Sequence, residues 1–302
     1  MKVAVTGSSG LIGARLVPAL RADGHEVLRL VRRTPRTADE HRWDPQHRRI
    51  DPALLPDVDA VINLAGTPIR PRPWTTGYKQ QLRSSRLEAT STVSEALADA
   101  LRADPSRPRV LLSASAVGFY GDTGARAVDE DSPPGTDFLA RLCTEWEAAT
   151  APAAEAGVRV THLRTGLVVG RGAPLMQILG LVFRAGVGGR MGSGEQYWPW
   201  VSLDDEVAAI RFLLTADVAG PVNLTAPTPV TNAEFARRLG RAVRRPAVLP
   251  VPRVALSLAL GEFGRTGVLA GQRALPRRLT EAGYDWVHPD LDDAFRAALS
   301  RA

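Results

Sequence analysis

Cysteine and lysine are almost absent from this sequence. Its 302 residues contain one cysteine, Cys143, and two lysines, Lys2 and Lys79. A single cysteine excludes a disulfide within the chain and is typical of a reducing compartment, so we expect a cytoplasmic protein. No apolar run approaches the length of a membrane span, and the first residues lack the apolar core of a signal peptide. We therefore expect no membrane partner.

Motifs for metal binding and for several kinds of hydrolysis are also missing. The five histidines are dispersed, and none pairs with another at a metal-ligand spacing. No G-x-S-x-G elbow and no Walker loop occurs. The net charge of +6 comes from arginines scattered among acidic residues, without the long basic run of a nucleic-acid-binding chain. The expected partner is a small molecule, with no metal and no nucleic acid.

Short apolar segments alternate with helical patterns in the first half of the chain. The apolar segments predict strands at 2–6, 25–31, 59–64, 109–114 and 158–164. Helical periodicity predicts a helix that begins at Leu11 and that Gly24 closes, with further helices at 76–102 and 137–156. This alternation favours a parallel sheet covered on both faces. The predicted fold class is α/β, a doubly wound parallel sheet of the Rossmann type.

The pattern loosens after Gly166. Helices are predicted at 174–185, 205–215 and 231–243. The last has an N-cap candidate, Thr231, with Glu234 three positions further on. An acidic stretch, DEDSPPG at 129–135, is expected to be a solvated loop. No repeat and no long linker separates the parts.

A glycine-rich turn follows the first predicted strand. The sequence TGSSGLIG places Gly7, Gly10 and Gly13 at the spacing G-x-x-G-x-x-G. Such glycines permit a tight turn, a close approach of the backbone to a pyrophosphate, and close packing of helix on sheet. The free amides of the helix N-terminus favour the pyrophosphate itself. The expected cofactor contacts are Gly7, Ser8, Ser9, Gly10, Leu11, Ile12 and Gly13.

The end of the second strand indicates which dinucleotide is bound. An acidic residue there would accept from the ribose 2′-hydroxyl of NAD, but the sequence VLRLVRRTPR offers Arg32 and Arg33 instead. Guanidinium groups suit a 2′-phosphate, so the predicted cofactor is NADP. Solvated arginines in an arginine-rich chain are the alternative. We predict an NADP-binding domain of residues 1–165 and 202–224, with a smaller substrate-side region of 166–201 and 225–302.

Several further segments carry a family resemblance. Together with the glycine turn, the chain resembles the extended NAD(P)-dependent epimerase/dehydratase branch of the short-chain dehydrogenase/reductase superfamily. It is most similar to an atypical subfamily of epimerase family proteins, some called cell-division-inhibitor homologues, which end in a domain of unknown function. The segments are DAVINLAG (59–66), KQQLRSSRLEAT (79–90), SASAVGFYG (113–121), DFLARLCTEWE (137–147), GSGEQYWPWVSLDD (192–205), NLTAPTPVTNAEFA (223–236) and GQRALPRRLTEAGYDWVHPDLDDAF (271–295).

The resemblance implies further cofactor contacts and a catalytic serine. The turn after the third predicted strand lines the cofactor in the superfamily, which implies contacts from Leu64, Ala65 and Gly66. The strand-end serine matches Ser115, with Ser113 close by. The segment LRTGLVVG usually passes the nicotinamide, which makes Arg164 a further candidate contact. Oligomeric state stays open, although the branch often forms dimers through its two long helices, here 76–102 and 137–156.

The catalytic pair of the superfamily is missing. Typical members carry Tyr-x-x-x-Lys on the helix after the serine strand, where the tyrosine transfers a proton and the lysine lowers the pKa of the tyrosine. The family often has an acidic residue four positions after this lysine, and Glu147 matches it. That match puts Leu139 at the tyrosine position and Cys143 at the lysine position. Tyr120 is a candidate replacement, or a packed tyrosine bonded to backbone. Cys143 is expected in the core rather than as a thiolate.

Three residues are tentative substrate contacts. Lys79 would bind an anion, or is a solvated helix residue. Arg86 stands where the branch often places an asparagine beside the active site, and would bind a phosphate or carboxylate unless it forms a surface ion pair. Trp200 would stack on a ligand or anchor its loop. The subfamily usually has histidine where this chain has Ser202, which removes one potential proton carrier.

Two functions from different classes remain open at this point. The first is an NADP-dependent oxidoreductase or epimerase of atypical mechanism. Its substrate would be a carbonyl, an alcohol or a nucleotide-sugar-like compound, Ser115 would hold the substrate oxygen, and Tyr120 would exchange the proton. The second is a catalytically inactive NADP(H)-binding sensor or regulatory protein, suggested by the missing Tyr-x-x-x-Lys pair.

Overall fold

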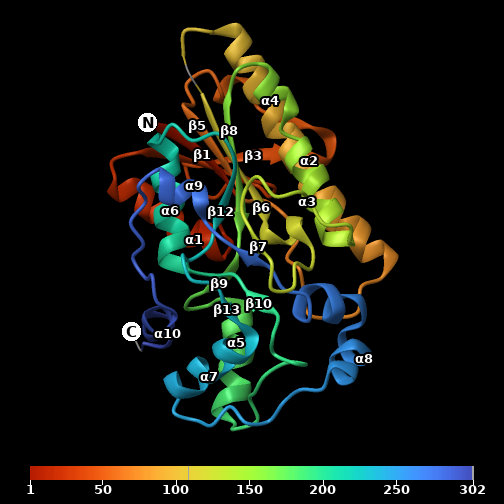
Figure 1. The fold of residues 1–302 in the computed structure, drawn as a ribbon. Coiled ribbons are helices and arrows are strands. Elements are labelled where there is room, and N and C mark those ends of the chain that lie inside the picture. The colour runs from red at the N-terminus through yellow and green to blue at the C-terminus, as the bar shows by residue number, and fades with distance from the viewer. Residues whose placement is uncertain (108, 301–302) are drawn as a thin grey trace.

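An eight-stranded sheet lies at the centre of the computed structural model, which describes residues 1–107 and 109–300 (Figure 1). The strand order is β12-β8-β6-β5-β1-β2-β3-β4, and only the edge pair β3–β4 is antiparallel. The predicted parallel sheet is therefore confirmed. Its strands are β1 (Lys2–Thr6), β2 (Glu26–Val31), β3 (Glu40–Asp44), β4 (Arg49–Ile50), β5 (Ala60–Asn63), β6 (Val110–Ala116), β8 (Arg159–Thr165) and β12 (Gly220–Leu224).

Helices cover both faces of the sheet (Figure 1). Side chains of β1 alternate between the faces: Val3 and Val5 pack against α1 and α6, whereas Ala4 packs against α2 and α4. Both faces are apolar, which is why the strands are nearly continuous hydrophobic runs. The helices on the sheet are α1 (Leu11–Ala22), α2 (Thr76–Ala103), α3 (Phe138–Ala148), α4 (Ala151–Glu155), α6 (Leu203–Thr215) and α9 (Arg277–Glu281).

The sheet order creates a crevice at the carboxyl ends of its strands. β1 is flanked by β2 on one side and by β5 on the other. The strands that follow β1 in the sequence are therefore added first on the β2 side and then on the β5 side. In doubly wound sheets a dinucleotide binds across such a point, with one half over each side. The glycine-rich turn follows β1 at this point, and the ends of β5 and β6 continue the edge away from β2.

Two segments differ from the sequence-based prediction. The predicted helix 137–156 is divided into α3 and α4, because Pro152 lies in the first turn of α4 and cannot donate the backbone hydrogen bond that a continuous helix requires. No strand was predicted at 40–50, where β3 and β4 extend the sheet. β3 is mostly polar, and only Glu40 and Trp43 are buried, which gives little strand signal.

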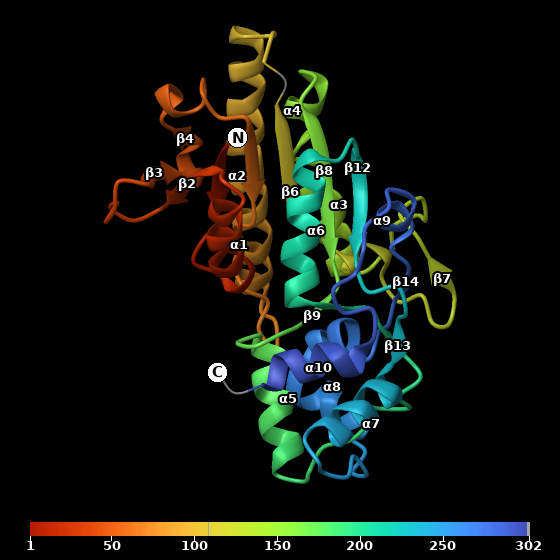
Figure 2. The ribbon, with the colours of Figure 1, turned by 90° about the vertical axis from the view of Figure 1, so that its left-hand side faces the viewer.

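A smaller region lies below the carboxyl ends of the strands (Figures 1 and 2). Its apolar core contains Phe183, Trp198, Phe235 and Phe295. Its helices are α5 (Pro174–Arg184), α7 (Asn232–Ala242), α8 (Arg253–Phe263) and α10 (Leu291–Leu299). Its short strands are β9 (Leu167–Val169), which pairs with β11 (Trp200–Ser202), and β10 (Tyr197–Trp198), which pairs with β13 (Val230–Thr231). Among the described residues, no helix has both the length and the apolarity to cross a membrane.

The N-cap predicted for α7 is present, and only half of the capping pattern forms. The Thr231 hydroxyl accepts from the Glu234 amide at 3.3 Å. The Glu234 carboxylate turns outward and pairs with Arg237 and Arg238 instead of returning to the Thr231 amide.

The chain returns to the main sheet near its C-terminal end. β14 (Arg273–Ala274) pairs in parallel with β7 (Ala127–Val128), which belongs to the loop between β6 and α3, and α9 packs against β12. Residues 273–281 therefore pack beside the main sheet, and the predicted division at residues 225–302 stays a prediction.

Asp205 holds the last part of the chain to α6. Its carboxylate is 1% exposed and accepts from the amides of Val287 and His288 at 2.7 and 3.0 Å. It also accepts from the Tyr284 hydroxyl at 3.1 Å and from the Ser202 hydroxyl at 2.5 Å. The Nδ1 atom of His288 lies 3.1 Å from the Ser202 hydroxyl.

We expect Asp205→Ala to lower the free energy of unfolding by about 3 kcal/mol, because several buried donors lose their acceptor. Urea unfolding of the variant and of the wild type measures the change. Asp204→Ala is the matched control: this neighbour is half exposed, pairs on the surface with Arg15 at 3.2 Å, and should change stability by less than about 1 kcal/mol. Equal effects of the two substitutions would contradict the anchoring role.

Candidate functional site

Backbone atoms lie so close to the glycine-rich turn that two of its glycines have no room for a side chain. Gly7 has φ +65°, and a Cβ there would lie 2.7 Å from the Leu64 carbonyl oxygen. A Cβ on Gly13 would collide with the Gly7 oxygen. Gly10 is the N-cap of α1 without a side-chain cap, and a Cβ there would meet only the Gly7 oxygen. No side chain caps the first amides of α1 within the described residues, which fits a pyrophosphate.

The turn after β5 lies directly against the glycine-rich turn. The Thr6 hydroxyl accepts from the amides of Leu64 and Ala65 at 3.0 and 3.1 Å, and donates to Asn63 at 2.7 Å. These bonds join the ends of β1 and β5. Gly66 is exposed beside them. Of the other expected contacts, Ser9 is exposed, and Ser8, Leu11 and Ile12 are half-buried at the start of α1. The predicted cofactor residues 7–13 and 64–66 are therefore brought together.

The arginines after β2 differ in how they are held. Arg33 donates two hydrogen bonds to Glu40, at 2.7 and 2.6 Å. The Arg33 guanidinium and the Arg36 amide lower the pKa of Glu40 to about 2. Asp39 is likewise engaged by Arg29. Both acids near the end of β2 are thus occupied, while Arg32 is exposed.

A buried ion pair connects β8 to α3. Arg164 is 3% exposed, and its Nε and Nη2 donate to Glu147 at 2.8 and 2.9 Å. Burial opposes its charge, but Glu147 outweighs the burial and raises the pKa of Arg164. The same carboxylate accepts from the Ser115 hydroxyl at 2.6 Å. Ser113 is also buried and accepts from the Asn63 amide at 3.4 Å. The side chains of Ser113 and Arg164 are enclosed by protein, and a cofactor contact from either residue stays a prediction.

Tyr120 joins the same network from the turn after β6. Its hydroxyl donates to Asn223 Oδ1 at 2.8 Å and accepts from Arg164 Nη1 at 3.0 Å. Burial raises the pKa of Tyr120 to about 12, against the effect of Arg164. The phenol is therefore neutral near pH 7. The Ser115 and Tyr120 hydroxyls are both engaged inside the protein, and their part in proton transfer stays a prediction.

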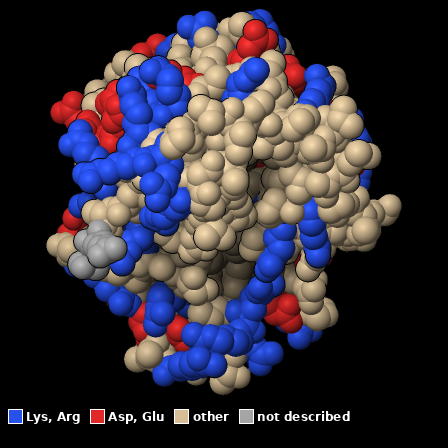
Figure 3. Space-filling view, turned by 90° about the horizontal axis from the view of Figure 1, so that it is seen from below, with Lys and Arg blue, Asp and Glu red and all other residues tan. Residues whose placement is uncertain are grey.

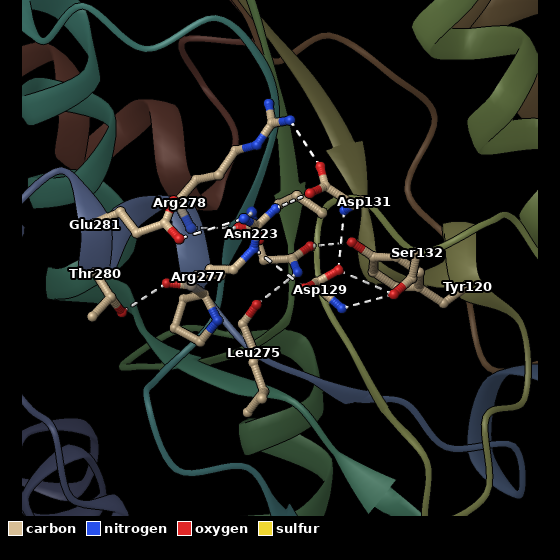
Figure 4. Close-up of polar contacts among 12 residues, drawn as sticks. Tyr120, Asp129, Asp131, Ser132, Asn223, Leu275, Arg277, Arg278, Thr280 and Glu281 are labelled. Carbon is tan, nitrogen blue, oxygen red and sulfur yellow. Dashed lines mark hydrogen bonds and ion pairs between the residues drawn. The ribbon is translucent and has the colours of Figure 1, made fainter.

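An acidic loop completes the network, and the prediction that it is solvated is wrong for Glu130 although Asp131, Pro133 and Pro134 are exposed. Glu130 is 4% exposed and accepts from the amides of Asn223 and Arg278 at 3.0 and 3.3 Å. Its neighbours Asp129 and Asp131 form ion pairs with Arg277, and Asp131 also pairs with Arg278 at 3.1 Å (Figure 4). The sequence analysis missed Glu130 and Asn223. The one available signal was the complementary charge of DED at 129–131 and RR at 277–278.

The positions of the missing catalytic pair are apolar in the structure. Leu139 lies against the turn after β6, since a Cβ on Gly118 would be 3.4 Å from the Leu139 Cβ. Cys143, one turn further along α3, is buried, and burial raises the pKa of its thiol to about 12. Cys143 is therefore a neutral core residue, as expected. His162 is half-buried, with Nε2 2.8 Å from the Thr150 hydroxyl.

Two of the three tentative substrate residues are occupied by protein contacts. Lys79 lies 2.9 Å from Glu262 of α8 and above the ring of Phe138. Trp200 is completely buried, and its Nε1 donates to the Thr228 carbonyl at 3.2 Å. These contacts favour the loop-anchoring alternative, and a substrate contact of Trp200 stays a prediction. Arg86 is 7% exposed, and within residues 1–107 and 109–300 it forms no surface ion pair.

A separate cavity of about 590 Å³ lies on the outside of the smaller region. Five of its lining residues are arginines: Arg190, Arg237, Arg241, Arg244 and Arg245. Figure 3 shows this lower face, on which basic groups surround an uncharged central area. The cavity is lined by α7 and the loop after it, and contains no residue of the glycine-rich turn or of the sheet. We therefore place the candidate site at the strand ends. No cluster of potential metal ligands occurs among the residues that the structure describes.

The fold and the strand-end geometry define a Rossmann-type dinucleotide-binding protein. The model of the NAD dependent epimerase/dehydratase family matches residues 3–225, and a domain of unknown function, DUF1731, matches 251–298. The chain belongs to this epimerase/dehydratase family, which confirms the resemblance noted from the sequence.

Relatives match along almost the whole chain. Epimerase family protein MT2273 of Mycobacterium tuberculosis is 48% identical over 300 residues, covering 99% of this chain and 98% of the relative. The human epimerase family protein SDR39U1 is 36% identical, covering 99% and 100%. The crystal structure of that human protein (isoform 2) with NADPH has a TM-score of 0.88 at 35% identity, covering 99% of each chain. A nucleoside-diphosphate sugar epimerase from Corynebacterium glutamicum has a TM-score of 0.80 at 33% identity, covering 99% of this chain and 58% of the other.

A buried carboxyl group lies close behind the network. Glu206 of α6 is 0% exposed, and its Oε1 accepts from the Thr165 hydroxyl at 2.8 Å. Its Oε2 has no hydrogen-bond partner within the described residues. Burial raises the pKa of Glu206 to about 8. Between the ordinary pKa of a glutamate and about pH 8, Glu206 therefore holds a proton in the folded chain that it has released in the unfolded chain.

This proton makes stability depend on pH. The stabilising contribution of neutral Glu206 is complete below the ordinary pKa of a glutamate and is lost as pH rises to about 8. We expect Glu206→Gln to gain stability relative to the wild type between about pH 5 and pH 8, with no further gain above. Urea unfolding at several pH values measures the difference. Glu155→Gln on the exposed surface of α4 is the control, and a pH-independent difference at Glu206 would contradict the expectation.

Proposed function

We propose that this chain binds NADP(H) and is an oxidoreductase or epimerase of atypical mechanism. The observation that carries the proposal is the strand-end geometry. An uncapped helix start fits the pyrophosphate, and exposed Arg32 beside Arg33 follows β2, where both nearby acids are already paired. With no free carboxylate for a ribose 2′-hydroxyl, this end of β2 suits a 2′-phosphate. The human relative was solved with NADPH, which supports the same cofactor.

The bound cofactor would supply a hydride acceptor or donor for a carbonyl or alcohol carbon. The residues of this chain would position the substrate and exclude water. The ion pair of Arg164 and Glu147 holds the Ser115 and Tyr120 hydroxyls in place through hydrogen bonds. In the reactive state we propose that Ser115 orients the substrate oxygen and that neutral Tyr120 donates its own proton to that oxygen. Substrates with a carbonyl, an alcohol or a nucleotide-sugar-like group are the class to test.

A second candidate function is an NADP(H) sensor without turnover. The observation that favours it is the set of protein contacts on Ser115 and Tyr120, together with the apolar Leu139 and Cys143. Such a protein would bind one redox form of the cofactor more tightly and would transfer no hydride.

We expect NADPH and NADP⁺ to bind more tightly than NADH and NAD⁺, and Arg32→Glu to weaken only the phosphorylated forms, by roughly 10- to 100-fold. Calorimetric titration with the four nucleotides measures both effects. Arg102→Glu is a matched control, because this exposed arginine lies at the opposite end of the sheet, in the last turn of α2. If the wild type binds no dinucleotide, the proposed function is wrong.

A panel of aldehydes, ketones and nucleotide sugars with NADPH separates the enzyme from the sensor. For an enzyme, we expect Ser115→Ala and Tyr120→Phe to lower turnover by about 100-fold or more, with unchanged NADPH affinity. Tyr284→Phe is the control, because it removes another buried hydroxyl, bonded to Asp205 and outside the network. Tight binding of one redox form with no turnover on any compound would favour the sensor instead.

A further inference from the structure

Arg86 is a buried cation without an acidic partner. It is 7% exposed on α2, and burial lowers the pKa of its guanidinium. Its Nη1 donates to two backbone carbonyls, those of Leu82 and Thr67, at 3.0 and 3.1 Å. Within the described part of the chain it forms no ion pair with Asp or Glu. A buried charge of this kind is costly unless an oxygen-rich group compensates it.

The free edge of the guanidinium faces accessible space. Within residues 1–107 and 109–300, neither Nε nor Nη2 of Arg86 has a hydrogen-bond partner, and neither is among the completely buried polar atoms. Arginine presents its donors as a rigid fork that cannot turn away independently. These donors therefore remain available for a ligand.

Arg86 lies beside the turn that follows β5. A Cβ on Gly66 would be 3.4 Å from the Arg86 Cγ and 3.5 Å from its Cζ. Gly66 follows Leu64 and Ala65, which close against the glycine-rich turn. On its other side, the Arg86 guanidinium stands over the ring of Trp146 of α3, 4.9 Å from its centroid. The same charge acts on the thiol of Cys143, one turn before Trp146.

The strand order tells which half of a dinucleotide Arg86 would meet. Arg32 and Arg33 follow β2, on the side of β1 that takes the adenosine half. Arg86 contacts the turn after β5 and the helix that follows β6, on the other side of β1. The other half of the dinucleotide, with the nicotinamide and its ribose, lies over that side.

We propose that Arg86 is a cofactor contact that binds oxygens of the nicotinamide half of NADP(H), with its free Nε and Nη2 donors. This inference rests on the proposed cofactor binding. The guanidinium of Arg86 extends from α2 past Gly66 toward the site. On α3, the positions of the missing catalytic pair, Leu139 and Cys143, are apolar. Because a guanidinium stays protonated, Arg86 holds and orients the ligand and carries no proton.

The alternative is a purely structural role, in which Arg86 only fastens the carbonyls of Leu82 and Thr67. The two roles predict opposite results for Arg86→Met. A structural arginine should lower the melting temperature when removed and leave the affinity of the folded protein unchanged. A ligand-binding arginine, which is destabilising while unpaired, should leave the melting temperature of the free protein unchanged or higher and weaken cofactor binding.

The experiment compares two ligands on the same variants. NADPH contains both halves, whereas adenosine 2′,5′-bisphosphate contains only the adenosine half with its 2′-phosphate. We expect Arg86→Met to weaken NADPH by roughly 10- to 100-fold and to leave the bisphosphate unchanged. The control, Arg83→Met, removes a guanidinium one turn away that is exposed and paired with Glu145, and should change neither affinity. Retained bisphosphate binding also shows that the variant is folded.

The remaining outcomes separate this inference from the proposed function. If the wild type binds neither ligand, cofactor binding itself is wrong. If the wild type binds both ligands and Arg86→Met binds NADPH equally well, only the role of Arg86 is overturned. If Arg86→Met binds neither ligand, Arg86→Lys decides: wild-type bisphosphate binding with weakened NADPH supports the contact, whereas equal loss of both ligands shows a structural role.

Discussion

The buried ion pair of Arg164 and Glu147 is the interaction on which the rest of the site depends. It joins the end of β8 to α3, and the Ser115 and Tyr120 hydroxyls are oriented by its charged atoms. Removing one partner of such a pair typically costs about 3–5 kcal/mol, because the other charge is left buried. The pair is compensated by hydrogen bonds and by the Phe119 ring, which lies 3.5 Å from the guanidinium carbon. The network thus fixes the Ser115 and Tyr120 side chains before any ligand binds.

The arginines on the two sides of β1 differ in whether an acidic residue pairs with them. On the β2 side, Arg33 is matched by Glu40 within the protein, and Arg32 is left to solvent. On the β6 side, Arg164 is paired with Glu147, whereas Arg86 is buried with no carboxylate partner among the residues that the structure describes. A folded domain tolerates one such unpaired charge at the expense of stability when a ligand later compensates it. The two buried arginines on this side therefore differ in their pairing, and the unmatched one, Arg86, is the one that we propose meets the ligand.

The sequence was informative where neighbouring residues carry the signal. The turn at 7–13, the arginines after β2 and the long helix α2 follow from local pattern and spacing, and the structure assembles them as predicted. Glu130, Asn223 and Arg278 were not predictable in this way, because each is defined by partners about 50 to 150 positions away. Trp200 illustrates a different limit, since the sequence left open whether it stacks on a ligand or anchors its loop, and only the fold shows that it is completely enclosed.

The pairing of β7 with β14 has a consequence for how such a chain can be inherited. The two family models match separate stretches, 3–225 and 251–298. The second stretch nevertheless supplies Arg277 and Arg278 to the acidic loop, and the Leu275 carbonyl to Asn223. A recombination joint between the two stretches would give the loop before α3 a foreign partner. The C-terminal domain is thus not an exchangeable module, and substitutions at the two sides of this contact are expected to arise together.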